Sequence, residues 1–143
     1  MAEKTIKFEI ATPERVVFQK DIRQVTVPTT SGEITVLPDH IPLISVLKPG
    51  VLEIVSGEKD LEIISVSGGF IEVLKDKIVI LADTAERAAE LDEARIEEAR
   101  LRAEERKKEV ADLDEVQFAK ISVQLEKEMA RLKAVTKWRN LKR

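Results

Sequence analysis

The stretch Ser67-Gly68-Gly69-Phe70 decides how this chain is organised, because Gly69 is the last glycine or proline in the sequence. All five glycines and all five prolines precede Phe70, and none follows it before Arg143. Glycine and proline are the strongest breakers of regular structure. The pattern therefore predicts a front part rich in turns and a back part in which nothing interrupts a helix.

In the front part, apolar and polar residues alternate along short segments, which is typical of strands with one buried face. Ile6, Phe8 and Ile10, for example, are separated by charged residues. The run IVIL at 78–81 is apolar at every position, which is typical of a strand covered on both faces. Turn signals such as KPG at 48–50 recur between these segments. Roughly eight to ten short strands at this spacing predict an antiparallel β-sandwich or flattened barrel.

Charge separates the two parts as well. Residues 85–143 carry 29 of the chain's 51 charged side chains. A segment so rich in charge cannot bury a thick core of its own. We therefore predict two domains, a β-sandwich at residues 1–84 and a helical hairpin at residues 85–143.

Helix-start patterns place the two helices of the back part. Asp83 with Glu86 three residues later can start the first helix, and Asp92 is an alternative start. Asp114 with Gln117 starts the second helix. The short turn between the helices predicts an antiparallel hairpin.

The apolar stripes of the two helices differ in size. The first is mostly alanine, and each missing methylene forgoes ~0.8 kcal/mol of burial, so the seam is thin. Two interpretations stay open: a weakly held hairpin that a better partner opens, and a permanently folded hairpin in which alanines allow close approach. The stripe positions are Ala88, Ile96, Ala99, Ala103 and Val110 in the first helix, and Phe118, Ile121, Leu125, Leu132, Val135 and Trp138 in the second.

Basic residues dominate the end of the chain. From Lys120 to Arg143 there are eight basic residues and only two acidic ones, Glu126 and Glu128. Two interpretations fit this excess of positive charge. One is a solvated face that suits the dipole at the helix C-terminus, and the other is a docking strip for an acidic partner.

Several function classes lack the residues that they need. The chain has no cysteine and a single histidine, His40, with no ligand spacing around it, so we predict no metal site. No phosphate-binding or nucleophile motif is present, and we predict no catalytic residue. The net charge of −3 argues against nucleic-acid binding. Because no apolar run reaches 18 residues, we expect no direct membrane insertion. The residues alone therefore predict a non-enzymatic, partner-binding protein.

Three segments carry a resemblance to a known family. Residues 31–43 are SGEITVLPDHIPL, residues 67–73 are SGGFIEV, and residues 81–87 are LADTAER, followed by LDEAR at 91–95. They are similar, in this order, to segments of the ε subunit of rotary F-type ATP synthases, whose loop has the pattern G-x-[IL]-x-[VI]-L-P-x-H-x-P. The similarity extends over the whole chain.

The resemblance implies a fold of about ten strands in an N-terminal antiparallel β-sandwich, followed by a C-terminal antiparallel two-helix hairpin. It implies a non-catalytic central-stalk subunit that couples proton (or sodium) flow to ATP synthesis. Its expected partners are the γ subunit and the c ring. The hairpin is expected to reach the α and β catalytic subunits and to inhibit ATP hydrolysis. The expected location is peripheral, on the cytoplasmic side of a bacterial plasma membrane.

The resemblance also carries roles onto residues of this sequence. Contacts with the c ring are implied for Glu33 and His40, in a loop shaped by Ile34 and Pro42. Inhibitory docking onto acidic residues of β is implied for four basic residues of the second helix, Arg131, Lys133, Lys137 and Arg139.

Some bacterial relatives bind ATP through a motif [IL]-D-x-x-R-A in the folded hairpin. Leu91, Asp92 and Arg95 match it, but Ile96 stands where the motif has alanine. No cofactor is required, and a regulatory ATP is the expectation, held by Leu91, Asp92, Arg95, Arg100 and Arg102. The alternative is that Asp92 caps the helix and Arg95 pairs with a neighbouring glutamate.

A different class of function stays open on the residues alone. The chain also fits a free-standing β-sandwich binding module with a coiled-coil adaptor. Stable co-purification with a γ-like partner would separate the two interpretations, because only the stalk subunit requires it.

Overall fold

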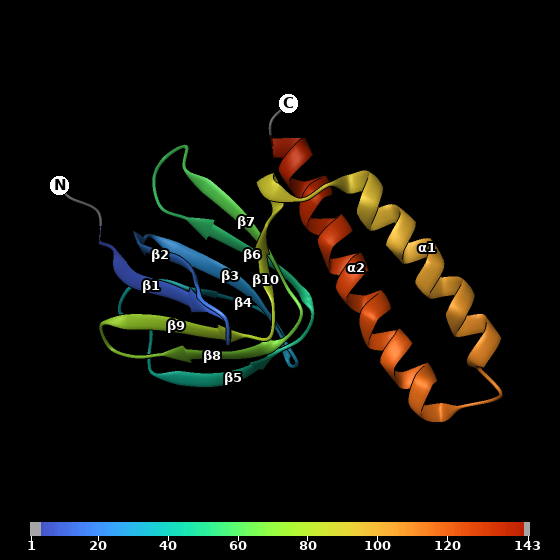
Figure 1. Cartoon of the computed structure of the whole chain (residues 1–143). Coiled ribbons are helices and arrows are strands. Elements are labelled where there is room, and N and C mark those ends of the chain that lie inside the picture. The colour runs from blue at the N-terminus through green and yellow to red at the C-terminus, as the bar shows by residue number, and fades with distance from the viewer. Residues whose placement is uncertain (1–3, 142–143) are drawn as a thin grey trace.

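The computed structural model describes residues 4–141 and contains, within them, ten strands followed by two α-helices (Figure 1). This confirms the predicted fold class. The strands are β1 Ile6–Ala11, β2 Val16–Ile22, β3 Gln24–Thr29, β4 Gly32–Val36, β5 Leu43–Leu47, β6 Gly50–Val55, β7 Leu61–Val66, β8 Gly69–Val73, β9 Lys77–Ala82 and β10 Ala85–Arg87. A short 3₁₀ helix, η1 Ala88–Glu90, precedes α1 Glu93–Val110 and α2 Glu115–Leu141.

The strands form one sheet that folds back on itself. Their order is β10-β7-β6-β3-β5-β8-β9-β1-β2, with β4 paired to β3. All pairs are antiparallel except β1 with β9, which run parallel. The two ends of the sheet approach each other, because the guanidinium of Arg87 in β10 lies 5.4 Å from the ring centroid of Phe18 in β2. The result is the flattened barrel that the strand spacing predicts.

Inward-facing residues of the strands form the main core. In β1, Ile6, Phe8 and Ile10 are buried, as their alternation predicts. The rings of Phe8 and Phe18 meet edge to face with centroids 5.9 Å apart. Fully burying a side chain of this size stabilises a fold by roughly 1.5–3 kcal/mol, so this core is the main source of stability in the sandwich.

The prediction that residues 78–81 are covered on both faces is wrong. Ile78 and Ile80 are fully buried, but Leu81 is 56% exposed on the other face of β9. The reason is the position of the hairpin, since α2 packs on β6 and β7 and leaves the outer face of β8 and β9 open (Figure 1).

The first helix starts at the alternative site, Asp92, whose side chain accepts hydrogen bonds from the amides of Ala94 (3.0 Å) and Arg95 (3.3 Å). The start predicted at Asp83 and Glu86 is wrong. Residues there form β10, in which Glu86 lies opposite Ser65 of β7. Pairing with the edge of β7 therefore prevails over the local helix-start pattern. The predicted domain division between residues 84 and 85 stays a prediction, and β10 lies just beyond it.

The second helix starts where its pattern predicts. The side chain of Asp114 accepts hydrogen bonds from the amides of Val116 (3.0 Å) and Gln117 (3.2 Å). Near this turn the ammonium of Lys107 lies 5.1 Å from the ring centroid of Phe118, which links the two helices.

The hairpin lies against the sandwich through α2, with α1 on the outside (Figure 1). Ala134 of α2 is fully buried and forms a second small core with Val51, Ile63 and Ala88. Small side chains thus bring α2 close to the sheet. Of the predicted stripes, Ala88 lies in η1 instead of α1. Ile96, Ala103, Ile121 and Val135 are buried, and Ala99, Val110, Phe118, Leu125, Leu132 and Trp138 are half-buried.

Candidate functional site

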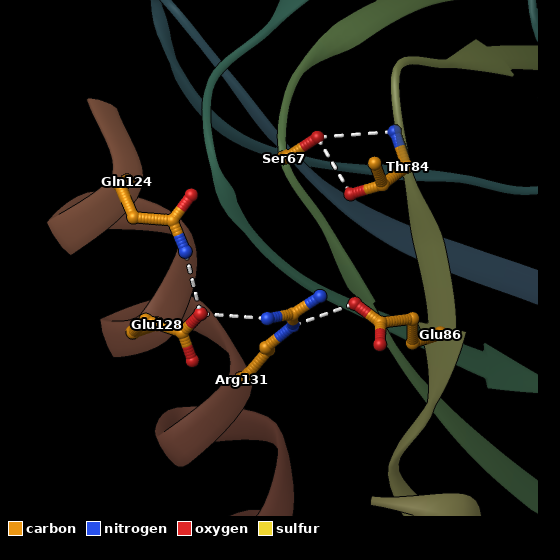
Figure 2. A network of polar contacts seen from close by, with 6 residues as sticks. All are labelled: Ser67, Thr84, Glu86, Gln124, Glu128 and Arg131. Carbon is orange, nitrogen blue, oxygen red and sulfur yellow. Dashed lines mark hydrogen bonds and ion pairs between the residues drawn. The ribbon is translucent and has the colours of Figure 1, made fainter. Parts of the chain in front are cut away.

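A network of polar contacts joins α2 to the sandwich (Figure 2). The Nε atom of Arg131 donates to Oε1 of Glu86 in β10 (2.6 Å), and its Nη1 atom donates to Oε1 of Glu128 (2.7 Å). Gln124 Nε2 donates to the same oxygen of Glu128 (2.8 Å). The side chain of Glu128 is only 3% exposed. Arg131 is therefore held from both sides, by its own helix and by β10.

A pair of hydroxyls supports β10 beside this network. Ser67 Oγ accepts from the backbone amide of Thr84 (3.0 Å) and lies 2.7 Å from Thr84 Oγ1 (Figure 2). These bonds fix the segment that leads into Glu86.

Three of the four predicted docking residues, which we term the docking cations, form ion pairs within the chain. Besides Arg131, Lys137 pairs with Glu53 of β6 (3.0 Å), and Arg139 pairs with Glu93 at the start of α1 (3.0 Å). Lys133 is exposed and forms no ion pair within residues 4–141. The docking cations are Arg131, Lys133, Lys137 and Arg139.

The residues predicted to meet the c ring differ in exposure. Glu33 is exposed near the start of β4, and Pro42 is exposed just before β5. Ile34 is half-buried and packs against the main core. His40 follows the end of β4, and its Nδ1 donates to its neighbour's carbonyl, Ile41 O (2.6 Å). Glu33 therefore lies within β4, and His40 lies in the segment between β4 and β5.

The loop that carries His40 has a polar anchor. Asp39 adopts a φ of 69°, an uncommon conformation for a residue other than glycine. Lys4 Nζ donates to Asp39 Oδ2 (2.7 Å), and this hydrogen bond raises the pKa of Lys4. The N-terminal segment thus ties down the loop.

The five residues predicted to hold ATP have different surroundings in the folded chain, and their role stays a prediction. Asp92 caps α1, as the alternative interpretation has it. Arg100 lies between Glu97 and Glu104, and its hydrogen bond with Glu97 raises the pKa of the guanidinium. Leu91 precedes the cap and Arg95 is exposed, with no ion pair in the part of the chain that the structure describes.

Arg102 alone of the five lines a hollow of about 520 Å³ between α1 and α2. Arg106 and Lys120 line it as well. Sequence reasoning missed these two cations, although Arg102 and Arg106 are four residues apart, the spacing that puts two side chains on one helix face. The hollow is therefore a candidate anion site.

An apolar row crosses the open face of the sandwich. Val46 of β5 lies opposite Phe70 of β8, and Phe70 lies opposite Leu81 of β9. The row continues through Ala11 of β1 to Val16 of β2. Phe70 is 55% exposed, and exposed apolar patches of this kind mark interaction sites. Sequence reasoning missed the row because it took the apolar residues of β9 as covered on both faces.

Comparison with known proteins gives one consistent result. Residues 5–88 match the family described as ATP synthase, Delta/Epsilon chain, beta-sandwich domain. The ATP synthase epsilon chain of Desulforamulus reducens is 44% identical over 92% of this chain and 97% of its own length. That of Syntrophobacter fumaroxidans is 43% identical over 96% of this chain and 99% of its own length.

The chain belongs to the ATP synthase epsilon chain family. The predicted resemblance is thereby confirmed. The interpretation as an unrelated adaptor module is not supported, because the relatives cover both the sandwich and the hairpin.

Solved structures share the epsilon chain fold. A chain of the Euglena gracilis mitochondrial ATP synthase OSCP/F1/c-ring assembly is similar with a TM-score of 0.77 and 23% identity, over 88% of this chain and 78% of that one. A chain of the Tetrahymena thermophila mitochondrial ATP synthase central stalk/c-ring gives a TM-score of 0.59 and 15% identity, over 96% and 98%.

Two kinds of feature are absent from the residues that the structure describes. None of the helices within residues 4–141 has the length and apolar character needed to cross a bilayer. No group of three or more metal-binding side chains gathers in the same residues.

Proposed function

We propose that this chain is a non-catalytic central-stalk subunit of a bacterial F-type ATP synthase, working at the cytoplasmic side of the plasma membrane. In this role it couples ion flow to ATP synthesis and restrains ATP hydrolysis through its hairpin. The observation that carries the proposal is the two-part fold: a β-sandwich with an open apolar face, and a hairpin that charged contacts join to it.

The apolar row is the proposed binding face for the γ subunit. It lies on rigid strands, and a partner that covers Phe70 and Leu81 removes apolar surface from water at ~25 cal/mol per Å². The c ring is the proposed partner of the β4–β5 region, which carries the exposed Glu33 in β4 and the half-buried His40 in the following loop. Polar loops of a ring that turns with the stalk need contacts of this kind, charged and solvent-accessible.

Two variants test the proposal in one assembly experiment with an ATP synthase that lacks its epsilon chain. A chain ending at Ala88 keeps β10 and the main core, so we expect it to bind the stalk while ATP hydrolysis rises several-fold. Phe70→Asp places a charge inside the γ interface, and we expect binding to weaken about 100-fold. Leu113→Asp, at the exposed turn of the hairpin, is the matched control for binding.

Unchanged hydrolysis with the shortened chain would contradict the inhibitory role. Unchanged binding of the Phe70→Asp variant would contradict the assignment of the apolar row to γ and leave the family membership untouched.

A regulatory nucleotide is a second proposal, favoured by the hollow between α1 and α2. Three cations there, Arg102, Arg106 and Lys120, suit a triphosphate. We expect calorimetric titration of the full chain with ATP to give heat of binding, and Arg102→Ala to weaken the affinity at least tenfold. Arg95→Ala, a cation outside the hollow, is the control. The absence of heat at millimolar ATP would contradict the proposal, and loss of binding in the control alone would favour the motif at residues 91–95.

A further inference from the structure

The docking cations have acidic partners already present in the folded chain. Arg131 pairs with Glu86 of β10, Lys137 with Glu53 of β6, and Arg139 with Glu93 of α1. These glutamates lie on three different elements and far apart in the sequence from their cations. Glu53 and Glu86 contact α2 from the sandwich, and Glu93 contacts it from α1.

Two of these ion pairs are partly buried, whereas the side chains of Arg139 and Glu93 are 49% and 46% exposed. The side chains of Arg131 and Lys137 are 20% and 34% exposed, and those of Glu86 and Glu53 are each 33% exposed. Such pairs are less screened by salt than fully exposed ones. Arg131 is oriented in addition by the buried Glu128, so its guanidinium is fixed before it meets Glu86.

We infer that Glu53, Glu86 and Glu93 form an internal acidic surface that holds α2 in the folded hairpin by occupying the cations that an acidic partner would bind. This inference rests on the proposed inhibitory function. Docking and folding then compete for the same side chains. These glutamates set the fraction of molecules whose hairpin is open, and only that fraction can inhibit ATP hydrolysis.

Lys133 has a different part in this arrangement. It is exposed on α2, in a groove whose lining includes Glu33 and Glu126, and forms no ion pair within the described residues. It is therefore the docking cation that can bind an acidic partner without first losing an ion pair of the folded chain.

Energy transfer between two dyes reports whether α2 lies on the sandwich. The chain has no cysteine, so Lys59→Cys and Asn140→Cys give unique labelling sites, both exposed, at the β6–β7 turn and near the end of α2. In the full chain we expect Glu53→Lys, and separately Lys137→Glu, to raise the ratio of open to closed hairpin roughly fivefold or more. Glu58→Lys is the control, because Glu58 is exposed on the same turn and forms no ion pair in the described residues.

The reciprocal exchange Glu53→Lys/Lys137→Glu is the decisive variant. We expect it to restore the closed hairpin, because the pair is rebuilt with its charges reversed, while inhibition of ATP hydrolysis in the assembled complex stays weakened. An unchanged dye distance in Glu53→Lys, or failure of the exchange to restore closure, would overturn the inference. Full inhibition by the exchanged variant would overturn it too, since Lys137 would then not be shared. If the distances change as expected but the unaltered chain itself does not inhibit ATP hydrolysis in the assembled complex, the internal pairs are supported and the proposed inhibitory function is contradicted.

Discussion

Replacing Gly69 with alanine is expected to destabilise the β-sandwich severely. Gly69 has a φ of 135°, and a Cβ atom built there would lie 2.1 Å from Leu81 O and 2.8 Å from Ala82 Cα. Both atoms belong to the backbone of β9 and cannot move aside without breaking the β8–β9 pairing. We expect a loss of more than ~4 kcal/mol in the free energy of unfolding, against a typical total of roughly 5–15 kcal/mol.

Two other glycines separate the clash from the backbone strain. Gly32 has a φ of 119° but nothing within 4 Å of the added atom, so Gly32→Ala reports the strain alone, about 1–3 kcal/mol. At Gly57 the added atom would meet only Asp60 Cβ, at 3.3 Å, and the backbone is not in the left-handed region. Gly57→Ala is therefore expected to lower the free energy of unfolding by less than ~1 kcal/mol. Denaturant unfolding of the three variants measures the order. A Gly69→Ala chain as stable as Gly32→Ala would show that β9 yields to the new side chain.

Arg131→Met is expected to detach the hairpin from the sandwich. The substitution keeps an unbranched stem but leaves the buried carboxylate of Glu128 with the hydrogen bond from Gln124 and no cation, and it removes the cation that pairs with Glu86. Breaking a buried ion pair by removing one partner costs roughly 3–5 kcal/mol. Hydrogen exchange of the α2 amides measures the effect, which we expect to be confined to the hairpin while the strands stay protected.

A compensating variant tests the reason for this loss. Arg131→Met/Glu128→Leu removes the stranded charge together with the cation, and we expect most of the protection of α2 to return, since an apolar pair of similar volume often replaces a buried ion pair without loss. Lys108→Met, at an exposed cation of α1 that lies outside the hollow between the helices and has no ion pair in residues 4–141, is the control. A double variant no better protected than Arg131→Met would contradict the explanation.

Sequence patterns that extend over a few residues predicted the features that depend on neighbouring residues alone. Alternation in β1, the cap at Asp114 and the absence of glycine and proline after Gly69 were sufficient for the strands, the second helix and the fold class. The start of the first helix could not be decided in this way. Asp83 and Glu86 have the right spacing for a cap, but the edge of β7 competes for the same backbone, and only the three-dimensional fold reveals that competition.

Only part of the candidate site could be predicted from the sequence, and the contacts of its residues could not. The positive charge of α2 is visible in the sequence, whereas the partners of Arg131 and Arg139 lie 45 and 46 residues away along the chain. The apolar row shows a related limit. An apolar residue on each face of β9 indicates that something covers both faces, but it does not indicate whether that cover comes from the same chain or from another protein.

The parallel pairing of β1 with β9 has a consequence for how the protein is made. Lys7 lies opposite Lys77, so the first strand to leave the ribosome has to wait for the ninth before both of its edges are occupied. Contacts between such distant parts of a chain form slowly, and a strand with a free edge is prone to pair with the wrong chain. Newly made molecules are therefore most vulnerable to aggregation during the interval between the synthesis of β2 and that of β9, and a chaperone that shields this one edge would protect them.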